Sequence, residues 1–223
     1  MSNGFVIIAS LKRKYLLSAM MCYDSIKDHW PEANITLFVD STVYDKDLLE
    51  GYNVVHEDVP SDERAKLWAL DKSPYDITAY LDADTIVVHD DIQTIFDQLG
   101  EHDMLFTRIR EYNSNRKGYM ENVGYEHHGG VFLYNKNAHD FVGQWWEDWD
   151  AIKSNEDFKL KYPDIPVRMS VWDQFYLWNL IHNTDHGLSI GFFEEDARWN
   201  FVVGYKAKEL NGKGAIIEHY TLK

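Results

Sequence analysis

Cysteine is almost absent from this sequence, since Cys22 is the one cysteine among 223 residues. A lone thiol excludes an internal disulfide, and the apolar residues just before it, at positions 19–21, indicate a buried helix face. Both features are typical of proteins that work in a reducing compartment. We therefore expect a cytoplasmic protein.

Long apolar runs are lacking as well. No stretch approaches the roughly 18 uninterrupted apolar residues that a membrane-spanning helix needs. The apolar run at residues 5–9 is short and precedes its basic residues, which is the wrong order for a secretory signal. Internal repeats and linkers are not seen either. With 45% hydrophobic residues the chain can fill a sizeable core, and we expect one domain over residues 1–223.

Positive charge is scarce, because 22 basic residues face 37 acidic ones and the formal net charge is -15. Such a chain repels polyanions, so unaided binding to nucleic acid or to anionic lipid is not expected. The basic residues gather in two places, which indicates either solvated surface or loops that meet phosphate. One group is Lys12, Arg13 and Lys14, and the looser second group is Arg108, Arg110, Arg116 and Lys117.

The apolar pattern predicts strands that alternate with helices. We expect strands at residues 5–9, 35–39, 54–55, 77–81, 130–134 and 215–217, helices at 15–29, about 62–71, 140–152 and 172–181, and a polar loop around Pro163 and Pro166. This order predicts an α/β fold with a doubly wound, Rossmann-like, mostly parallel sheet and helices on both faces. Ligands of such sheets bind beyond the carboxyl ends of the strands, where Ser10, Asp82 and Asp84 would meet.

Asp82 and Asp84 come directly after the strand predicted at 77–81, so both carboxylates can converge on one cation. Oxygen ligands of this kind suit Mg²⁺ or Mn²⁺, which usually keep open positions for substrate phosphates. A divalent ion can neutralise the charge that develops on a diphosphate leaving group during sugar transfer. The Asp-x-Asp pattern by itself is also produced by ordinary acidic loops.

Three motifs in order give this pattern a context: AKLWAL at 65–70, YLDADTIVV at 80–88 and HGGVFLY at 128–134. They resemble successive motifs of glycogenin-like (family 8 type) retaining glycosyltransferases. Asp173-Gln174 is similar to the family's Asp-Gln pair, and IIEHY at 216–220 to its last strand with a metal-binding histidine. The resemblance implies a single GT-A domain that moves a sugar from a UDP-sugar donor with retention. The acceptor stays open: a glycan, a protein, a lipid-linked sugar or a modified base.

The resemblance also implies a role for individual residues of this sequence. Asp82, Asp84 and His219 would bind the metal, and the imidazole favours Mn²⁺ over Mg²⁺. Asp173 and Gln174 would face the anomeric carbon as catalytic residues. The donor would contact Ala9, Ser10, Tyr15, Arg64, Lys66, Ala83, His128, Gly129 and Gly130. We expect His219 to leave the carboxyl end of the strand at 215–217, at the same sheet edge as the aspartates.

The chain departs from the family in two places. His128-Gly129 stands where the family has a polar pair before a glycine, which changes the groups that can read the donor sugar's hydroxyls. Lys223 lies four residues after His219 and no glycine follows the histidine, whereas the family's phosphate-binding lysine lies six residues on.

Other interpretations remain open at this point. A haloacid dehalogenase-type phosphatase would use Asp82 as nucleophile and Asp84 as acid and base, although the motif lies late in the chain. A non-catalytic sugar-nucleotide-binding module is a third hypothesis. Trp145 and Trp149 share one face of the helix predicted at 140–152 and are expected in the core, whereas Trp199 is a candidate for an acceptor cleft.

Overall fold

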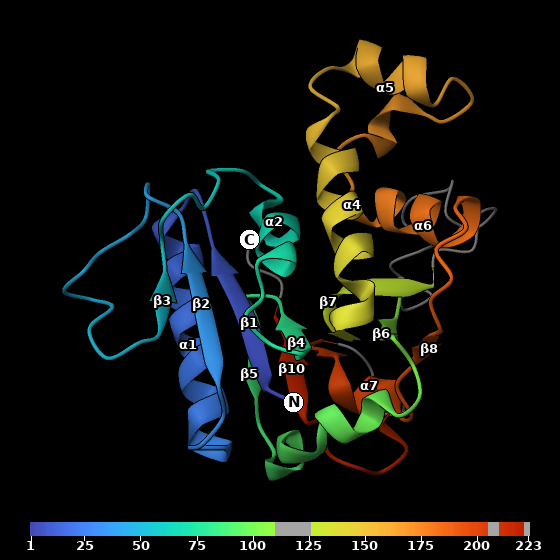
Figure 1. Ribbon diagram of the computed structural model, residues 1–223. Coiled ribbons are helices and arrows are strands. Elements are labelled where there is room, and N and C mark those ends of the chain that lie inside the picture. Colours follow the sequence, from blue (N-terminus) through green and yellow to red (C-terminus); the bar gives the residue numbers. More distant parts are fainter. Residues whose placement is uncertain (110–125, 205–209, 221–223) are drawn as a thin grey trace.

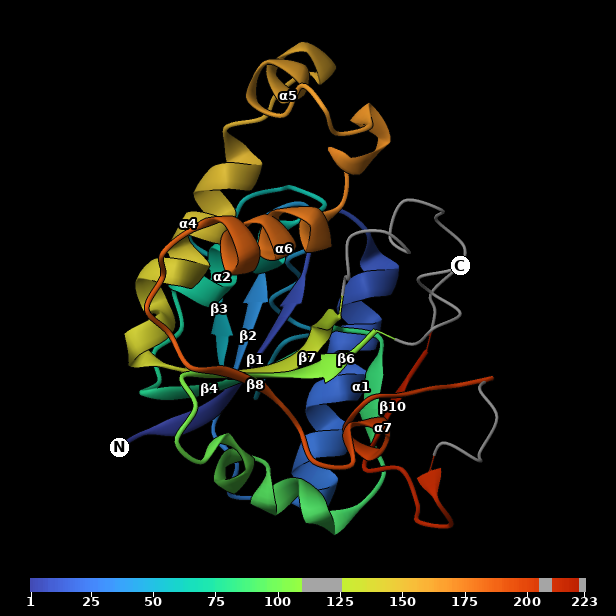
Figure 2. The same ribbon diagram turned by 90° about the vertical axis from the view of Figure 1, so that its right-hand side faces the viewer.

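The computed structural model describes residues 1–109, 126–204 and 210–220. In this part of the chain a seven-stranded sheet carries helices on both faces, and a three-stranded sheet lies beside it (Figures 1 and 2). None of the described helices is long and apolar enough to cross a membrane. Arg110, Arg116, Lys117 and Lys223, named above for their charge, lie outside the described residues.

The large sheet is mostly parallel. Its strands lie in the order β3 (Val54–Val55), β2 (Ile35–Val39), β1 (Asn3–Ala9), β4 (Ile77–Leu81), β7 (His127–Asn135), β6 (Met104–Arg108) and β8 (Ile190–Phe192). Every pairing is parallel except the two that involve β7, which runs against the other strands. The predicted α/β sheet is therefore confirmed, with one reversed strand that begins three residues earlier than expected.

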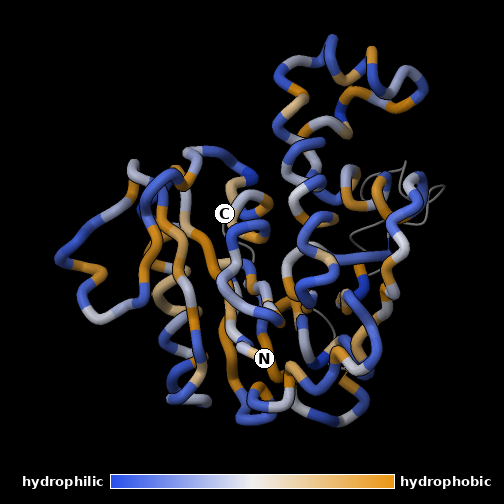
Figure 3. Tube along the Cα trace, viewed as in Figure 1, coloured by the Kyte–Doolittle hydropathy of each residue, from blue (hydrophilic) through white to orange (hydrophobic). Residues whose placement is uncertain are grey.

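The strands form here because they are apolar on both faces, as strands of covered parallel sheets are. The residues of β2 are all buried, and so are those of β1 after Asn3. One core cluster packs the sheet against α1 (Arg13–His29), and the other packs it against α2 (Ala65–Asp71), α4 (His139–Asp150) and α6 (Asp173–Asn183). Figure 3 shows much of the apolar colour in the strands between these layers. Trp145 is fully buried in the second cluster, as predicted.

The structure departs from the sequence-based predictions in two places outside the main strands, at residues 155–161 and at Trp199. The stretch expected as a polar loop contains α5 (Asn155–Lys161), which Ser154 caps by accepting a hydrogen bond from the Asp157 N–H at 3.1 Å. Short helices elsewhere in the described residues include η1 (Asp90–Thr94), η2 (Phe96–Leu99), η4 (Lys136–Ala138), η5 (Val167–Met169) and α7 (Asp196–Trp199). Trp199 is 4% exposed and packs against Phe193, so the hypothesis that it lines an acceptor cleft is wrong.

The last described strand belongs to the small sheet and not to the large one. This sheet has the order β5 (Thr85–Val87), β10 (Ile217–His219) and β9 (Phe201–Val202). β10 pairs antiparallel with β5, and His219 lies opposite Thr85. The strand expected at 215–217 is therefore shifted by two residues and ends on the histidine itself.

Candidate functional site

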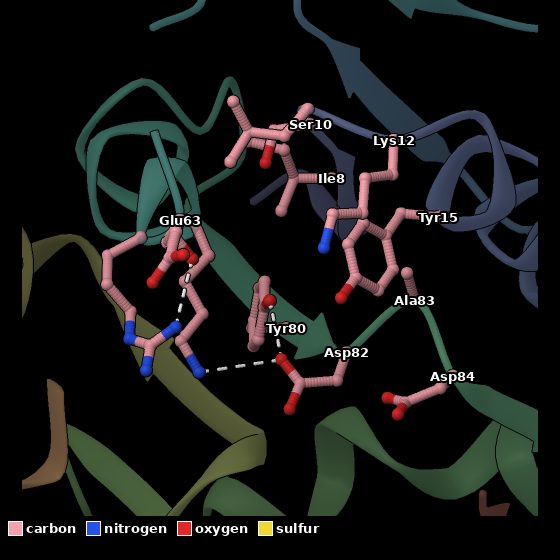
Figure 4. A pocket seen from close by; sticks show the side chains of 12 residues that line it. Ile8, Ser10, Lys12, Tyr15, Glu63, Tyr80, Asp82, Ala83 and Asp84 are labelled. Atoms are coloured by element: carbon pink, nitrogen blue, oxygen red, sulfur yellow. Dashed lines mark hydrogen bonds and ion pairs between the residues drawn. The ribbon is translucent and has the colours of Figure 1, made fainter. Parts of the chain in front are cut away.

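A cleft of about 370 Å³ opens at the carboxyl ends of β1 and β4 (Figure 4). Its walls hold residues from the turn after β1, the start of α2 and the end of β4: Ile8, Ser10, Leu11, Lys12, Tyr15, Glu63, Arg64, Lys66, Tyr80, Asp82, Ala83 and Asp84. The expectation that Ser10, Asp82 and Asp84 share one mouth is confirmed. Of the nine residues predicted to bind the donor, Ser10, Tyr15, Arg64, Lys66 and Ala83 line this cleft. Ala9, His128, Gly129 and Gly130 do not, and Ala9 is fully buried in β1.

Asp82, Asp84 and His219 form a group that could hold a metal ion, with one ligand atom from each within 4.8 Å of the others. The Nε2 atom of His219 lies 3.2 Å from Asp84 Oδ1 and 4.0 Å from Asp82 Oδ2. The predicted position of His219 is thus right, but the predicted reason is wrong. The histidine reaches the aspartates because β10 pairs with β5 directly after Asp84, and not because it leaves the edge of the large sheet.

The electrostatics of this group favour a positive charge between the ligands. Burial alone would raise the pKa of Asp82, but the Lys66 ammonium, His219 and the Tyr80 hydroxyl together hold it below its ordinary value. Burial would lower the pKa of His219, but the hydrogen bond to Asp84 and the charges of both aspartates raise it. The two carboxylates therefore attract a cation to the place that they share with the imidazole.

The packing around the group also fits a small cation. A Cβ atom at position 130 would lie 2.6 Å from Asp82 Oδ2 and 2.8 Å from His219 Cε1, so Gly130 is what lets these two ligands approach each other. Two carboxylates and one imidazole are a donor set that Mn²⁺ accepts readily and Mg²⁺ less well. The residues present thus fit the metal that we expect from the sequence.

Asp173 is held beside the metal group by two cations. It is the first residue of α6 and is 8% exposed, with Lys66 Nζ 2.7 Å from its Oδ2 and Arg64 Nε 3.3 Å from its Oδ1. Burial would raise the pKa of Asp173, but these two cations lower it to about 2. Lys66 also donates to the Gly129 carbonyl at 3.0 Å and lies 3.5 Å from Asp82 Oδ1. One ammonium group therefore links α6, the glycine pair and the metal ligands.

The other predicted residues lie near this centre. Gln174 follows Asp173 on α6 and is half-buried, but it is not among the residues that line the cleft. His128 is at the start of β7, where burial lowers the pKa of its ring to about 3 and keeps it neutral. Trp145 supports α6 by donating from Nε1 to the Asp173 carbonyl at 2.9 Å.

Tyr15 lies in the first turn of α1 and lines the cleft beside Lys12 (Figure 4). The ammonium groups of Lys14 and Lys12 lie 5.2 and 5.9 Å from the centre of its ring. Arg13 turns away and pairs with Asp45 at 3.1 Å. Lys12 of the first basic group thus lines the cleft. In the second group, Arg108 stacks on Phe192 at 3.6 Å.

Sequence reasoning missed three residues that shape the site. Tyr80 donates from its hydroxyl to Asp82 Oδ1 at 2.8 Å (Figure 4), and its position two residues earlier on the same strand could have suggested this. Asp40 is fully buried and accepts a hydrogen bond from the Leu11 N–H at 2.7 Å, which fixes the turn after β1. Asn200 contacts His219, and no pattern along the chain indicated it.

The comparisons with known proteins concern the fold. No family model matches the chain, and no curated protein does. A galactosyltransferase, LgtC, solved with donor and acceptor sugar analogues, matches with a TM-score of 0.60 and 17% identity over 99% of this chain and 87% of that chain. Apo GlyE of Streptococcus pneumoniae TIGR4 matches with a TM-score of 0.63 and 17% identity, over 100% of this chain and 55% of that chain. This chain has a GT-A glycosyltransferase fold.

A third match extends the same picture. It is a glycosyltransferase involved in the glycosylation of the major capsid of PBCV-1, with a TM-score of 0.51 and 14% identity, over 98% of this chain and 92% of that chain. At such identities the GT-A likeness concerns the fold and not the substrates. The resemblance to glycogenin-like enzymes therefore stays a prediction, and the matched structures give the phosphatase hypothesis no support.

Proposed function

We propose that this chain is a metal-dependent glycosyltransferase that moves a sugar from a UDP-sugar to an acceptor such as a glycan, a protein, a lipid-linked sugar or a modified base. The observation that carries the proposal is the group of Asp82, Asp84 and His219 at the mouth of the cleft of a GT-A fold. The likeness to LgtC spans 99% of the chain, which supports one domain over residues 1–223. A cytoplasmic setting stays part of the proposal.

The metal ligands would hold Mn²⁺, or Mg²⁺ with lower preference, and the bound ion would neutralise the diphosphate as it leaves. The chain's own residues bind and orient the donor. Tyr15 offers a ring face for the base, and Lys12 beside it adds positive charge at the same end of the cleft. Ser10, Arg64 and Ala83 also line the cleft. The donor therefore lies along the cleft with its diphosphate at the acidic group.

The sugar would lie against Gly129 and Gly130, with Asp173 and Lys66 beside it. A Cβ atom at position 129 would lie 3.6 Å from both Asp173 Oδ2 and Lys66 Nζ, so the backbone of this glycine lies directly beside these two side chains. His128 forms the edge of the same surface on β7. Lys66 is thus in reach of a phosphate oxygen or a sugar hydroxyl.

The state of Asp173 supports transfer with retention. An inverting enzyme needs a carboxylate base whose pKa suits proton removal from the acceptor hydroxyl. The pKa of Asp173 is held at about 2 by Lys66 and Arg64, so this carboxylate is a poor base. We assign Asp173 to holding Lys66 beside the sugar and Gln174 to the polar group near the anomeric carbon.

Calorimetry with nucleotides tests the proposal. Uridine diphosphate should bind the wild-type chain in Mn²⁺, more weakly in Mg²⁺, and not measurably in a chelator. Guanosine diphosphate should bind more weakly than uridine diphosphate, and Asp84→Asn should abolish Mn²⁺-dependent binding without changing the melting temperature in chelator. Equal binding with and without metal, or rapid hydrolysis of an aryl phosphate, would reject the proposal.

A further inference from the structure

A single buried amide connects the candidate metal ligand His219 with His128. Asn200 is 2% exposed, and its Oδ1 atom lies 2.9 Å from His219 Nδ1. Its Nδ2 atom lies 2.9 Å from Thr107 Oγ1 and 3.2 Å from His128 Nδ1. The two rings are 5.5 Å apart and nearly perpendicular. Asn200 thus contacts both histidines from behind the site.

The orientation of this amide is fixed by a backbone group. The Thr107 hydroxyl donates its one proton to the Val131 carbonyl at 3.1 Å, so towards Asn200 it can only accept. The NH₂ group of Asn200 must therefore face Thr107, and its carbonyl oxygen must face His219. Because that oxygen only accepts, the Nδ1 atom of His219 carries a proton. The Nε2 atom faces the other way, towards Asp84 and Asp82, and its proton is the one that a divalent cation would displace.

The same amide imposes the opposite arrangement on His128. Two donors point at His128 Nδ1, the Gly130 N–H at 3.0 Å and the Asn200 NH₂ at 3.2 Å. Nδ1 must accept both, so the proton of the neutral ring is on Nε2. Asn200 therefore favours a proton on Nδ1 of His219 and none on Nδ1 of His128. Both follow from the Val131 carbonyl, the Gly130 N–H and one side chain between the rings.

We infer that Asn200 is a positioning residue that holds His219 in the tautomer whose Nε2 can bind a divalent cation, and holds His128 in the opposite tautomer. The cation part rests on the proposed function, whereas the hydrogen bonds of Asn200 to the two Nδ1 atoms do not. Without the amide, Nδ1 of His219 loses its acceptor and the ring is free to turn or to move its proton to Nε2, where it would compete with a cation. Removing a group that orients a metal-binding histidine in this way commonly lowers metal affinity by about 10- to 100-fold.

Long-range proton–nitrogen NMR correlations of the chain, recorded with Zn²⁺ as a diamagnetic cation and without metal, show which ring nitrogens carry a proton. The spectra of His219→Ala and His128→Ala assign the two rings. We expect a proton on Nδ1 of His219 and on Nε2 of His128 in the wild type. In Asn200→Ala, His219 should shift towards the Nε2 tautomer, and calorimetry should show Mn²⁺ binding about 10- to 100-fold weaker.

Two further variants separate orientation from simple loss of packing. In Asn200→Asp the carboxylate still accepts from His219 Nδ1 but can no longer donate to Thr107 or His128. Mn²⁺ affinity should therefore return to within about threefold of the wild type while the His128 signals change. Asn135→Ala is the matched control, because its amide donates to Asp103 Oδ1 at 3.1 Å at the other end of β7, and it should leave Mn²⁺ affinity unchanged.

A His219 Nδ1 atom without a proton in the Zn²⁺-loaded wild type would overturn the inference, and so would unchanged Mn²⁺ affinity in Asn200→Ala. If Asn200→Ala does not fold, the wild-type tautomers and the Asn200→Asp variant still decide. If the wild type binds neither Mn²⁺ nor Zn²⁺, but His128 carries its proton on Nε2 and Asn200→Ala changes the His219 signals, the proposed function fails and the positioning of the two histidines stands.

Discussion

One methyl group added at position 130 should disable the cation site and leave the fold in place. In Gly130→Ala the new Cβ atom would lie 2.6 Å from Asp82 Oδ2, 2.7 Å from His128 Cε1 and 2.8 Å from His219 Cε1. Each distance is shorter than real Cβ contacts allow, so at least one metal ligand must move. Tyr80 and Lys66 hold Asp82, while Asn200 holds His219, so neither ligand yields without losing a contact.

The size of the effect follows from these distances. Restoring even a 3.0 Å contact moves Asp82 Oδ2 by about 0.4 Å, whereas metal–ligand distances tolerate about 0.2 Å. Overpacking of this kind costs about 1–3 kcal/mol. If the strain falls on the metal-bound geometry, it corresponds to a roughly 5- to 150-fold loss of Mn²⁺ affinity.

Gly129→Ala provides the matched control, because its Cβ atom would meet Trp145 at 3.5 Å and Asp173 and Lys66 at 3.6 Å, which are ordinary contacts. Calorimetric Mn²⁺ titrations of both variants, with melting temperatures in chelator, make the test. We expect weakened binding in Gly130→Ala and wild-type binding in Gly129→Ala. Equal Mn²⁺ affinity in Gly130→Ala and the wild type would refute the reasoning from this packing.

Three other predictions concern the residues around the cleft. The pKa of Asp173 is about 2 in the folded chain and ordinarily 3.8, so the ionised carboxylate stabilises the folded chain fully above about pH 4. This stabilisation is lost as the pH falls towards 2. In Asp173→Asn the free energy of unfolding should therefore depend less on pH in this range. Lys66→Met leaves this buried carboxylate with one cation and should cost about 3–5 kcal/mol in urea unfolding, part of which the double variant with Asp173→Asn should restore. Tyr15→Ala should weaken uridine diphosphate binding, whereas Tyr15→Phe should keep it; equal losses in both would argue against stacking.

The sequence predicted the parts of the fold in which periodicity and burial agree. The strand at 35–39 matches β2 to the residue, and the strand at 77–81 matches β4. The reversed direction of β7 was not predictable, because a strand buried on both faces is apolar whichever way it runs. β6 was missed altogether, and α5 was hidden by its polar residues and the prolines that follow it.

The candidate site was predictable as far as motifs and sheet topology reach. Asp82 and Asp84 were predicted as metal ligands because they come directly after an apolar strand. His219 was predicted because the last strand resembles that of glycogenin-like enzymes. Asn200 and Asp40 could not be found in this way, because their contacts join segments far apart in the chain, 19 residues in one case and 29 in the other. Such partners are fixed only when the strands pair and the side chains pack.

The central claim is that the acidic group at the mouth of the cleft supports transfer from a nucleoside-diphosphate sugar. The most direct test incubates the chain with Mn²⁺ and a panel of sugar nucleotides, and measures the release of free nucleoside diphosphate with and without chelator. We predict release from a UDP-sugar in Mn²⁺, none in chelator, and none from Asp84→Asn under either condition. Release that persists in chelator or in Asp84→Asn, or no release from any donor, would contradict the account.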